Sequence, residues 1–132
     1  MIHDRHFSIA EANAALDWVS ERIEAIREAR DRLAEPEAHA ALAEVAPANG
    51  GGEPARLVGE GFRDVRRRLV ELQAVGIVLR DLDRGLVDFP ALRDGREIYL
   101  CWELGEERVG HWHELEAGFA GRQPLPEVLS GT

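Results

Sequence analysis

The spacing of apolar residues changes once along this 132-residue chain, at Gly76. Before Gly76, apolar residues recur in alternating steps of three and four, which is typical of amphipathic helices. After Gly76, apolar and polar residues alternate with a period of two, which is typical of strands with one buried face. This order predicts an α+β fold, with helices first and an antiparallel sheet second.

The first helix is predicted over residues 7–35. Ser8 and Glu11 have the spacing of a capping box, in which each side chain satisfies a free amide at the other position. Pro36 is placed to end the helix. Its apolar stripe consists of Ile9, Ala12, Leu16, Val19, Ile23, Ile26 and Leu33.

The second helix is predicted over residues 55–75, with Gly76 as its C-terminal cap. Its apolar stripe consists of Val58, Phe62, Val65, Leu69 and Leu72. Residues 46–54 are rich in Gly and Pro and predict a flexible loop between the two helices. Together these segments predict a long antiparallel helical hairpin over residues 8–75.

The first turn of the sheet is predicted at residues 83–85, as a three-residue hairpin loop with Gly85 in the left-handed conformation. Counting outward from this loop places Arg80 opposite Asp88. The simplest interpretation of that pairing is a cross-strand ion pair.

The second turn is predicted at Asp94-Gly95, a strong type I′ signal that pairs Asp88 with Cys101. The first turn places Val87 and Phe89 on one apolar face, and the second turn independently places them on the same face. The full set on this face is Ile77, Leu79, Val87, Phe89, Ala91, Ile98, Leu100 and Trp102. Such agreement fixes the register. Pro90 has no amide proton, so it needs a bulge or an unpaired position.

The third turn leaves two alternatives open. A two-residue loop at residues 105–106 places His111 and His113 on the apolar face and Trp112 on the polar face. A bulge at Gly110 reverses this and places Trp112 in the core.

The length allows one modest core, so we expect a single domain over residues 1–132. The helical hairpin is expected to pack on the apolar face of a roughly four-stranded antiparallel meander over residues 76–113. A C-terminal loop and tail then occupy residues 114–132.

Composition excludes some classes of function. The formal net charge is −9, which argues against a non-specific nucleic-acid binder, because such proteins need a basic surface. No apolar run approaches the roughly 18 residues that a membrane span requires. The start of the chain does not resemble a secretion signal, and there is a single Cys, so a cytoplasmic location is expected.

Several short motifs occur together in one order. They are HFSIAEAN at residues 6–13, GLVDFP at 85–90, CW at 101–102, WH at 112–113 and GFAGR at 118–122. In these motifs the chain resembles a family of small bacterial proteins catalogued as domain of unknown function 2203. The resemblance implies a compact bacterial protein and carries no established activity, cofactor or catalytic residue. It adds weight to Asp88, Trp112, His113 and Arg122 as candidate functional residues.

The predicted polar face of the sheet places Asp88 beside Cys101. A neighbouring carboxylate raises the pKa of a thiol, which favours a packing role for Cys101 over a nucleophilic one. His111 and His113 lie two residues apart, so on a regular strand both point the same way and can donate two imidazoles to a metal. The alternative is an exposed His111 and a His113 bonded to backbone.

Arg122 lies at the end of the GFAGR motif. The glycines allow backbone amides to approach an anion with Arg122 as its charged anchor. The more common role of such an arginine is to clamp a loop onto a carboxylate of its own fold, here Asp88 or Glu103.

Two functions from different classes are predicted. The favoured one is a non-enzymatic binding or assembly module that forms a homo-oligomer, because the helical stripes are long and no complete catalytic set is present. The alternative is a metal-binding protein or small enzyme whose site requires Asp88, His113 and Arg122 to converge. The candidate binding residues are Asp88, Cys101, Trp112, His113 and Arg122. The sequence names no cofactor and no ligand.

Overall fold

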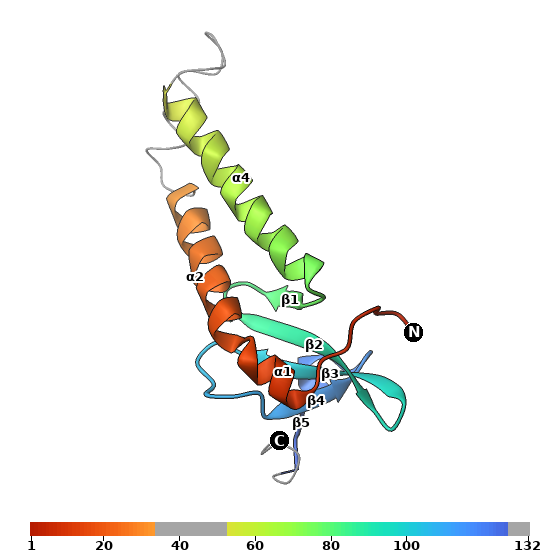
Figure 1. Cartoon of the computed structure of the whole chain (residues 1–132). Coiled ribbons are helices and arrows are strands. Elements are labelled where there is room, and N and C mark those ends of the chain that lie inside the picture. Colours follow the sequence, from red (N-terminus) through yellow and green to blue (C-terminus); the bar gives the residue numbers. More distant parts are fainter. Residues whose placement is uncertain (34–52, 127–132) are drawn as a thin grey trace. The chain divides into compact units, whose positions relative to one another are not determined.

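The computed structural model describes residues 1–33 and 53–126, with side chains from residue 59 onward in the second range. It contains helices and one antiparallel five-stranded sheet in the order β1-β2-β3-β4-β5, which confirms the α+β prediction (Figure 1). The strands are β1 (Val78–Asp81), β2 (Leu86–Arg93), β3 (Arg96–Glu103), β4 (His111–Glu114) and β5 (Gln123–Pro124). The prediction of four strands is wrong, because the chain returns after β4 and adds the two-residue strand β5.

The chain divides into two compact units. The first joins Met1–Glu21 to Leu72–Thr132 and contains the whole sheet. The second is Arg22–Glu71 and contains most of two long helices. A single domain, and the packing of the helices on the sheet, stay predictions.

The first helical segment begins as predicted, with the reciprocal Ser8 and Glu11 bonds of a capping box. It is not one helix, however, but α1 (Ile9–Ala14) followed by α2 (Leu16–Leu33). The interruption is at Ala15, whose amide is shared between the carbonyls three and four residues earlier, at 3.1 and 3.2 Å. This sharing tightens the turn locally. The predicted end at Pro36 lies outside the described residues.

The second unit holds two antiparallel helices, the later part of α2 and most of α4 (Glu53–Ala74). Arg22 and Glu71 form an ion pair at 3.0 Å at one end. At the other end, a Cβ on Gly61 would lie 3.1 Å from a methyl carbon of Leu33, so the absence of a side chain permits this close approach. Of the predicted loop at 46–54, the first seven residues lie outside the described part and the last two belong to α4.

The prediction that the whole apolar stripe of the second helix is buried is wrong. Phe62 is 61% exposed and Leu69 is 39% exposed, whereas Leu72 is buried. The contacts of Gly61 and Glu71 with α2 show which side of α4 faces its neighbour. Residues 62 and 69 are rotated away from that side, because each residue advances about 100° around a helix.

Helix α4 ends in a Schellman motif, as its predicted glycine cap requires. Gly76 has φ of +87°, its amide bonds the Gln73 carbonyl at 3.0 Å, and the Ile77 amide bonds the Leu72 carbonyl at 3.1 Å. The motif turns the chain directly into β1.

The first hairpin differs from its predicted register. Val78, not Arg80, pairs with Asp88, and the register shifts between Leu79 and Asp81. Arg80 is therefore the extra residue of a bulge. The left-handed Gly85 is confirmed, with φ of +66°. The prediction fails because a bulge leaves no signature in the alternation of apolar and polar residues on so short a strand.

The second hairpin is confirmed. Asp94 and Gly95 both have positive φ, and Asp88 pairs with Cys101. The other confirmed pairs are Val87 with Trp102, Phe89 with Leu100 and Ala91 with Ile98. Pro90 lies beyond the end of β1 and is unpaired on that side, where its carbonyl accepts the Phe7 amide at 2.7 Å.

The third hairpin has a long loop over residues 104–110 in place of the two-residue turn at 105–106. Leu100 pairs with Trp112, and Tyr99 pairs with His113. The alternative that places Trp112 in the core is therefore correct, although the longer loop produces it and not a local bulge. His113 lies on the opposite face, with Asp88 and Cys101.

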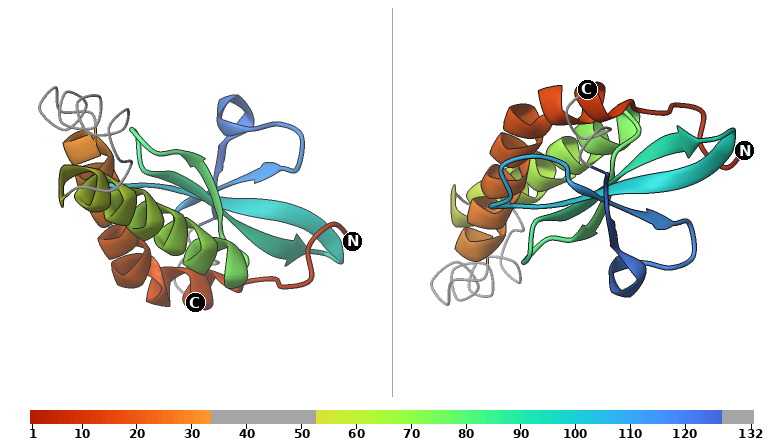
Figure 2. Two further views of the ribbon diagram at one scale, coloured as in Figure 1. Left: turned by 90° about the horizontal axis from the view of Figure 1, so that it is seen from above. Right: turned by 90° about the horizontal axis from the view of Figure 1, so that it is seen from below.

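Both faces of the sheet are covered within the first unit. In the two views of Figure 2, α1 (red) lies on one side of the sheet and the segment between β4 and β5 (blue) lies on the other. Phe7 packs edge to face against Phe89 on the α1 side. The polar face is therefore an enclosed surface and not a solvated one, as shown by the burial of Asp88, Tyr99 and Cys101.

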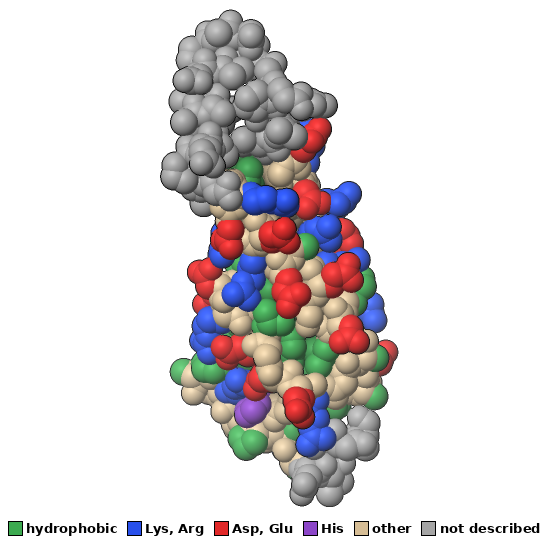
Figure 3. Space-filling view, turned by 90° about the vertical axis from the view of Figure 1, so that its left-hand side faces the viewer, with side chains coloured by type: hydrophobic (Ala, Val, Ile, Leu, Met, Phe, Trp, Pro, Cys, Tyr) green, Lys and Arg blue, Asp and Glu red, His purple; other side chains and the backbone are tan. Residues whose placement is uncertain are grey.

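The surface carries both signs of charge. Figure 3 shows acidic and basic side chains interspersed over the described part of one face of the molecule. Within residues 1–33 and 53–126, no helix has the length and apolar content needed to cross a bilayer.

Candidate functional site

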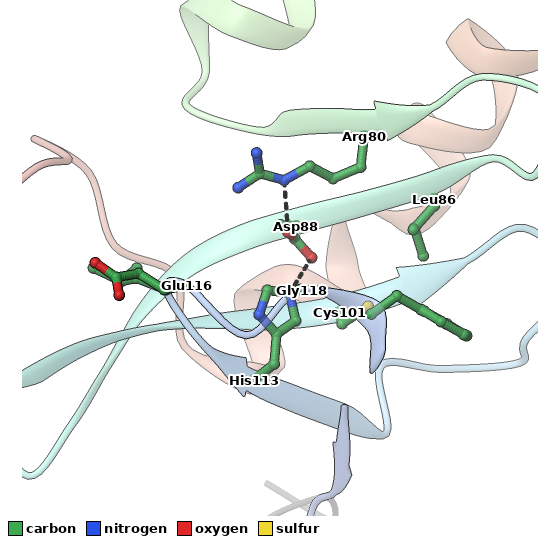
Figure 4. A pocket seen from close by; sticks show the side chains of 9 residues that line it. Arg80, Leu86, Asp88, Cys101, His113, Glu116 and Gly118 are labelled. Carbon is green, nitrogen blue, oxygen red and sulfur yellow. Dashed lines mark hydrogen bonds and ion pairs between the residues drawn. The ribbon is translucent and has the colours of Figure 1, made fainter. Parts of the chain in front are cut away.

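A cavity of about 220 Å³ opens on the polar face of the sheet (Figure 4). Strands β1 to β4 form its floor, and the segment after β4 forms its wall. The lining residues are Arg80, Leu86, Asp88, Cys101, His113, Leu115, Glu116, Gly118 and Phe119.

Three neighbouring strands bring a carboxylate, a thiol and an imidazole together in this cavity. Asp88 on β2 lies directly opposite Cys101 on β3, and His113 on β4 lies opposite Tyr99, two residues before Cys101 on β3. Since side chains alternate between faces, all these residues point to the same side. One ligand atom each from Asp88, Cys101 and His113 lies within 4.8 Å of the others, and all three residues are buried.

Asp88 is held between two nitrogen groups. Its Oδ1 lies 3.0 Å from His113 Nε2, and its Oδ2 accepts a hydrogen bond from Arg80 Nε at 2.8 Å. The predicted Arg80–Asp88 ion pair therefore exists, although the predicted register does not. A buried carboxylate is costly unless paired and hydrogen-bonded, and Asp88 has a partner on each oxygen.

Arg80 is held in its charged form. Partial burial works against the charge, but the hydrogen bond and ion pair with Asp88 outweigh it and raise the pKa of the guanidinium. Its side chain is still 42% exposed, and its guanidinium lies 4.9 Å from the centre of the Tyr99 ring.

The imidazole of His113 faces an oxygen on each side. Its Nδ1 lies 2.7 Å from the backbone oxygen of Glu114, which can only accept, so Nδ1 carries a proton. Nε2 faces the Asp88 carboxylate. It carries a second proton if the ring is a cation, or a lone pair that is free to bind a metal if the ring is neutral.

Cys101 is completely buried and in the thiol form. Burial, followed by the neighbouring charge of Asp88, raises the pKa of its thiol to about 12. A cysteine nucleophile needs the opposite shift, because the thiolate is the reactive species.

Arg122 does not join this group. Its Nη2 lies 2.5 and 2.6 Å from the two carboxylate oxygens of Glu106, and its guanidinium lies over the Phe119 ring. The predicted convergence of Asp88, His113 and Arg122 is thus correct for the first two only. The predicted clamp partner is also wrong, because the loop after β3 brings Glu106, and not Asp88 or Glu103, beneath the arginine.

The other two predicted residues lie away from the cavity. Trp112 is buried on the apolar face, where the Arg93 guanidinium lies 4.4 Å from its ring centre. His111 shares a face with His113, but its Nδ1 is 3.7 Å from a carboxylate oxygen of Glu106. Among the described residues, the group with metal-ligand geometry contains His113 without His111.

Sequence reasoning missed the N-terminal segment as a neighbour of the site. Glu97 accepts the amides of Ile2 and His3 at 2.7 and 3.0 Å and the His6 Nε2 at 3.0 Å. His3 Nε2 lies 2.6 Å from the Tyr99 hydroxyl. The alternation in β3 does place residues 97, 99 and 101 on one face. It does not identify the partners of Glu97 and Tyr99, because these lie more than 90 residues earlier in the chain.

Fold and cavity together define a small α+β protein with a buried Asp, Cys and His group at the base of one cavity. The family model described as "Uncharacterized conserved protein (DUF2203)" matches residues 5–125, and the chain belongs to this family. The match includes every residue that lines the cavity. No curated protein and no solved structure matches the chain.

Proposed function

We propose that the protein is a binding module for one divalent transition-metal ion of the zinc type, held by Asp88, Cys101 and His113. The observation that carries this proposal is the meeting of three ligand atoms, an oxygen, a sulfur and a nitrogen, within 4.8 Å. Thiolate, imidazole and carboxylate are the side-chain ligands of zinc in proteins.

The distances support coordination after a small adjustment. In a tetrahedral zinc site with bonds of about 2.0–2.3 Å, neighbouring ligand atoms lie roughly 3.3–3.7 Å apart. His113 Nε2 and Asp88 Oδ1 are 3.0 Å apart. The sulfur of Cys101 lies within 4.8 Å of both atoms, so an inward shift of at most about 1.5 Å completes the site.

The groups around the ligands also support a metal. A metal-bound imidazole usually donates its other ring N–H to a carbonyl or carboxylate, which fixes the tautomer. His113 makes this bond to the Glu114 carbonyl at 2.7 Å. The second oxygen of Asp88 is held by Arg80 in the same way that ligating carboxylates are held by outer partners.

The charges of the ligands also support a divalent ion. The Cys101 thiolate and the Asp88 carboxylate together offset its two positive charges, and the proton of the Cys101 thiol is released when the metal binds. A divalent ion is therefore neutralised by its own ligands inside the buried group.

The proposal is tested on tag-free protein purified without chelators. Elemental analysis should find about one zinc per chain, and cobalt(II) added to stripped protein should give a thiolate-to-cobalt charge-transfer band. Cys101→Ala should lose the band, and His111→Ala, which leaves the three ligands intact, should keep it. A wild-type protein that shows no stoichiometric metal and gives no cobalt band would overturn the proposal.

A second candidate function is self-assembly through α4. Phe62, Leu69 and Val70 are exposed on this helix, and the step of seven from Phe62 to Leu69 is the spacing of a helix-pairing seam. A second copy of the chain offers the same seam, which a two-fold dimer pairs with itself. Sedimentation equilibrium should show a dimer that Phe62→Glu dissociates. A strict monomer at high concentration would contradict it.

A further inference from the structure

The proposed metal would have one coordination position left over. Three protein ligands leave the fourth position of a tetrahedral ion available, as in zinc sites that bind a water or a substrate. The three ligands all line the cavity, so this position opens into it (Figure 4).

Arg80 on β1 also lines this cavity. Its guanidinium has five N–H donors, of which the bond to Asp88 uses one. An ion with two positive charges, the Asp88 carboxylate, the Cys101 thiolate and the Arg80 cation together carry one positive charge. The loaded site is thus suited to a ligand with one negative charge.

We propose that the cavity binds a small organic monocarboxylate, with one carboxylate oxygen on the metal and the other on the Arg80 guanidinium. The inference rests on the proposed metal site. Arginine suits this position because its planar donors match the two oxygens of a carboxylate.

The remaining lining restricts the ligand further. Leu86, Leu115 and Phe119 provide apolar contacts for a short hydrocarbon body. The volume of about 220 Å³ is several times the roughly 30 Å³ that one water occupies in the liquid, so a small acid fits. Glu116 also lines the cavity, but it is exposed, so solvent screens its charge more than the charges of the buried group. Its carboxylate still disfavours a second negative charge on the ligand. Butyrate should therefore bind more tightly than acetate, and inorganic phosphate more weakly than either.

The test uses cobalt-loaded full-length protein titrated with acetate, butyrate and inorganic phosphate, with the visible cobalt spectrum as the readout. Saturable changes with both acids, in the order given, are expected. Arg80→Met is titrated at saturating cobalt, because this arginine also holds the Asp88 ligand. It should weaken acid binding at least about tenfold, because a charged hydrogen bond is lost. Arg108→Met, at an exposed loop position, should leave binding unchanged.

The outcomes separate the two proposals. Arg80→Lys keeps a cation beside Asp88 but lacks the planar pair of donors, so at saturating cobalt it should bind the acids more weakly than the wild type. Cobalt binding with no saturable response to acid, or equal acid affinity in Arg80→Lys and wild type, overturns the carboxylate inference alone. Acid binding that appears only in Glu116→Gln also overturns it, because Glu116 then occupies the fourth position. Absence of cobalt binding overturns the metal site itself.

Discussion

Asp88 is the residue that joins the separate parts of the site. It faces Cys101 across the β2–β3 ladder, the Arg80 guanidinium on one oxygen and the His113 imidazole on the other. The Asp88–Cys101 pairing was predictable because Asp94-Gly95 permits one register only. The face of His113 was not predictable, because it depends on the length of the loop after β3, and the turn signal at residues 105–106 does not give that length.

The state of the Cys101 thiol gives a prediction at this scale. Because the sulfur is buried and its pKa is raised to about 12, the folded metal-free protein should react very slowly with iodoacetamide at pH 8. The same protein in denaturant should react at the rate of a free cysteine. Mass spectrometry measures the extent of alkylation over time. Rapid alkylation of the folded protein would contradict the burial of Cys101.

The protons of His113 give a second prediction. The Glu114 carbonyl requires a proton on Nδ1, so Nε2 is the nitrogen that would bind the metal. Nitrogen NMR of the zinc-loaded protein should therefore show a ring protonated at Nδ1 with zinc on Nε2. An imidazole spectrum that zinc does not change would contradict the assignment of Nε2 as the ligand atom.

At the scale of elements, the turns decide how much is predictable. The type I′ turn at residues 94–95 sets eight consecutive pairs correctly. The register of the first hairpin is shifted from the predicted one by the bulge at Arg80, and that of the third by the loop at 104–110. In this loop the Glu106 carboxylate accepts the Glu103 amide at 2.7 Å and pairs with Arg122. Such side-chain bonds shape a loop without leaving a periodic pattern in the sequence.

The turn at Gly85 gives a prediction with a matched control. Gly85 and Gly95 both have positive φ, but their surroundings differ. A Cβ on Gly85 would lie 2.5 Å from the Leu104 Cβ, whereas a Cβ on Gly95 would have no atom within 4 Å. Gly95→Ala should cost about 1–2 kcal/mol of folding free energy from the backbone alone. Gly85→Ala should cost a further 1–3 kcal/mol or so from crowding. Urea denaturation that gives equal losses would contradict this difference.

The attachment of the N-terminal segment gives a prediction about acid. Partial burial opposes the Glu97 charge, but the bonds from His3, His6 and Ile2 outweigh it and lower the pKa of its carboxyl from 4.5 to about 2. A lowered folded-state pKa contributes stability that is present above about pH 4.5 and is lost as the pH falls towards 2.

Glu97→Gln should therefore destabilise the protein at pH 7 and progressively less between pH 4.5 and 2, as measured by urea denaturation. Glu107→Gln, at an exposed loop position, serves as the control and should have little effect at either end of the range. A loss for Glu97→Gln that does not change with pH would show that the carboxylate charge is not what the segment binds.

At the scale of the whole molecule, the fold class follows from the change of period at Gly76, and the family follows from motifs spread over most of the chain. The site follows from neither alone. Its ligands come from strands β2, β3 and β4, and its wall comes from a segment after β4 without regular spacing. The five candidate residues thus separate into three that meet, Asp88, Cys101 and His113, and two with structural contacts, Trp112 and Arg122.

The central claim is that Asp88, Cys101 and His113 together bind one divalent ion. Native mass spectrometry of tag-free protein, stripped and then given one equivalent of zinc, measures this binding directly. The predicted result is a mass increase of one zinc less two protons in the wild type, and no stable adduct in Cys101→Ala. A wild-type protein without the adduct, or a Cys101→Ala variant that binds zinc equally well, would contradict it.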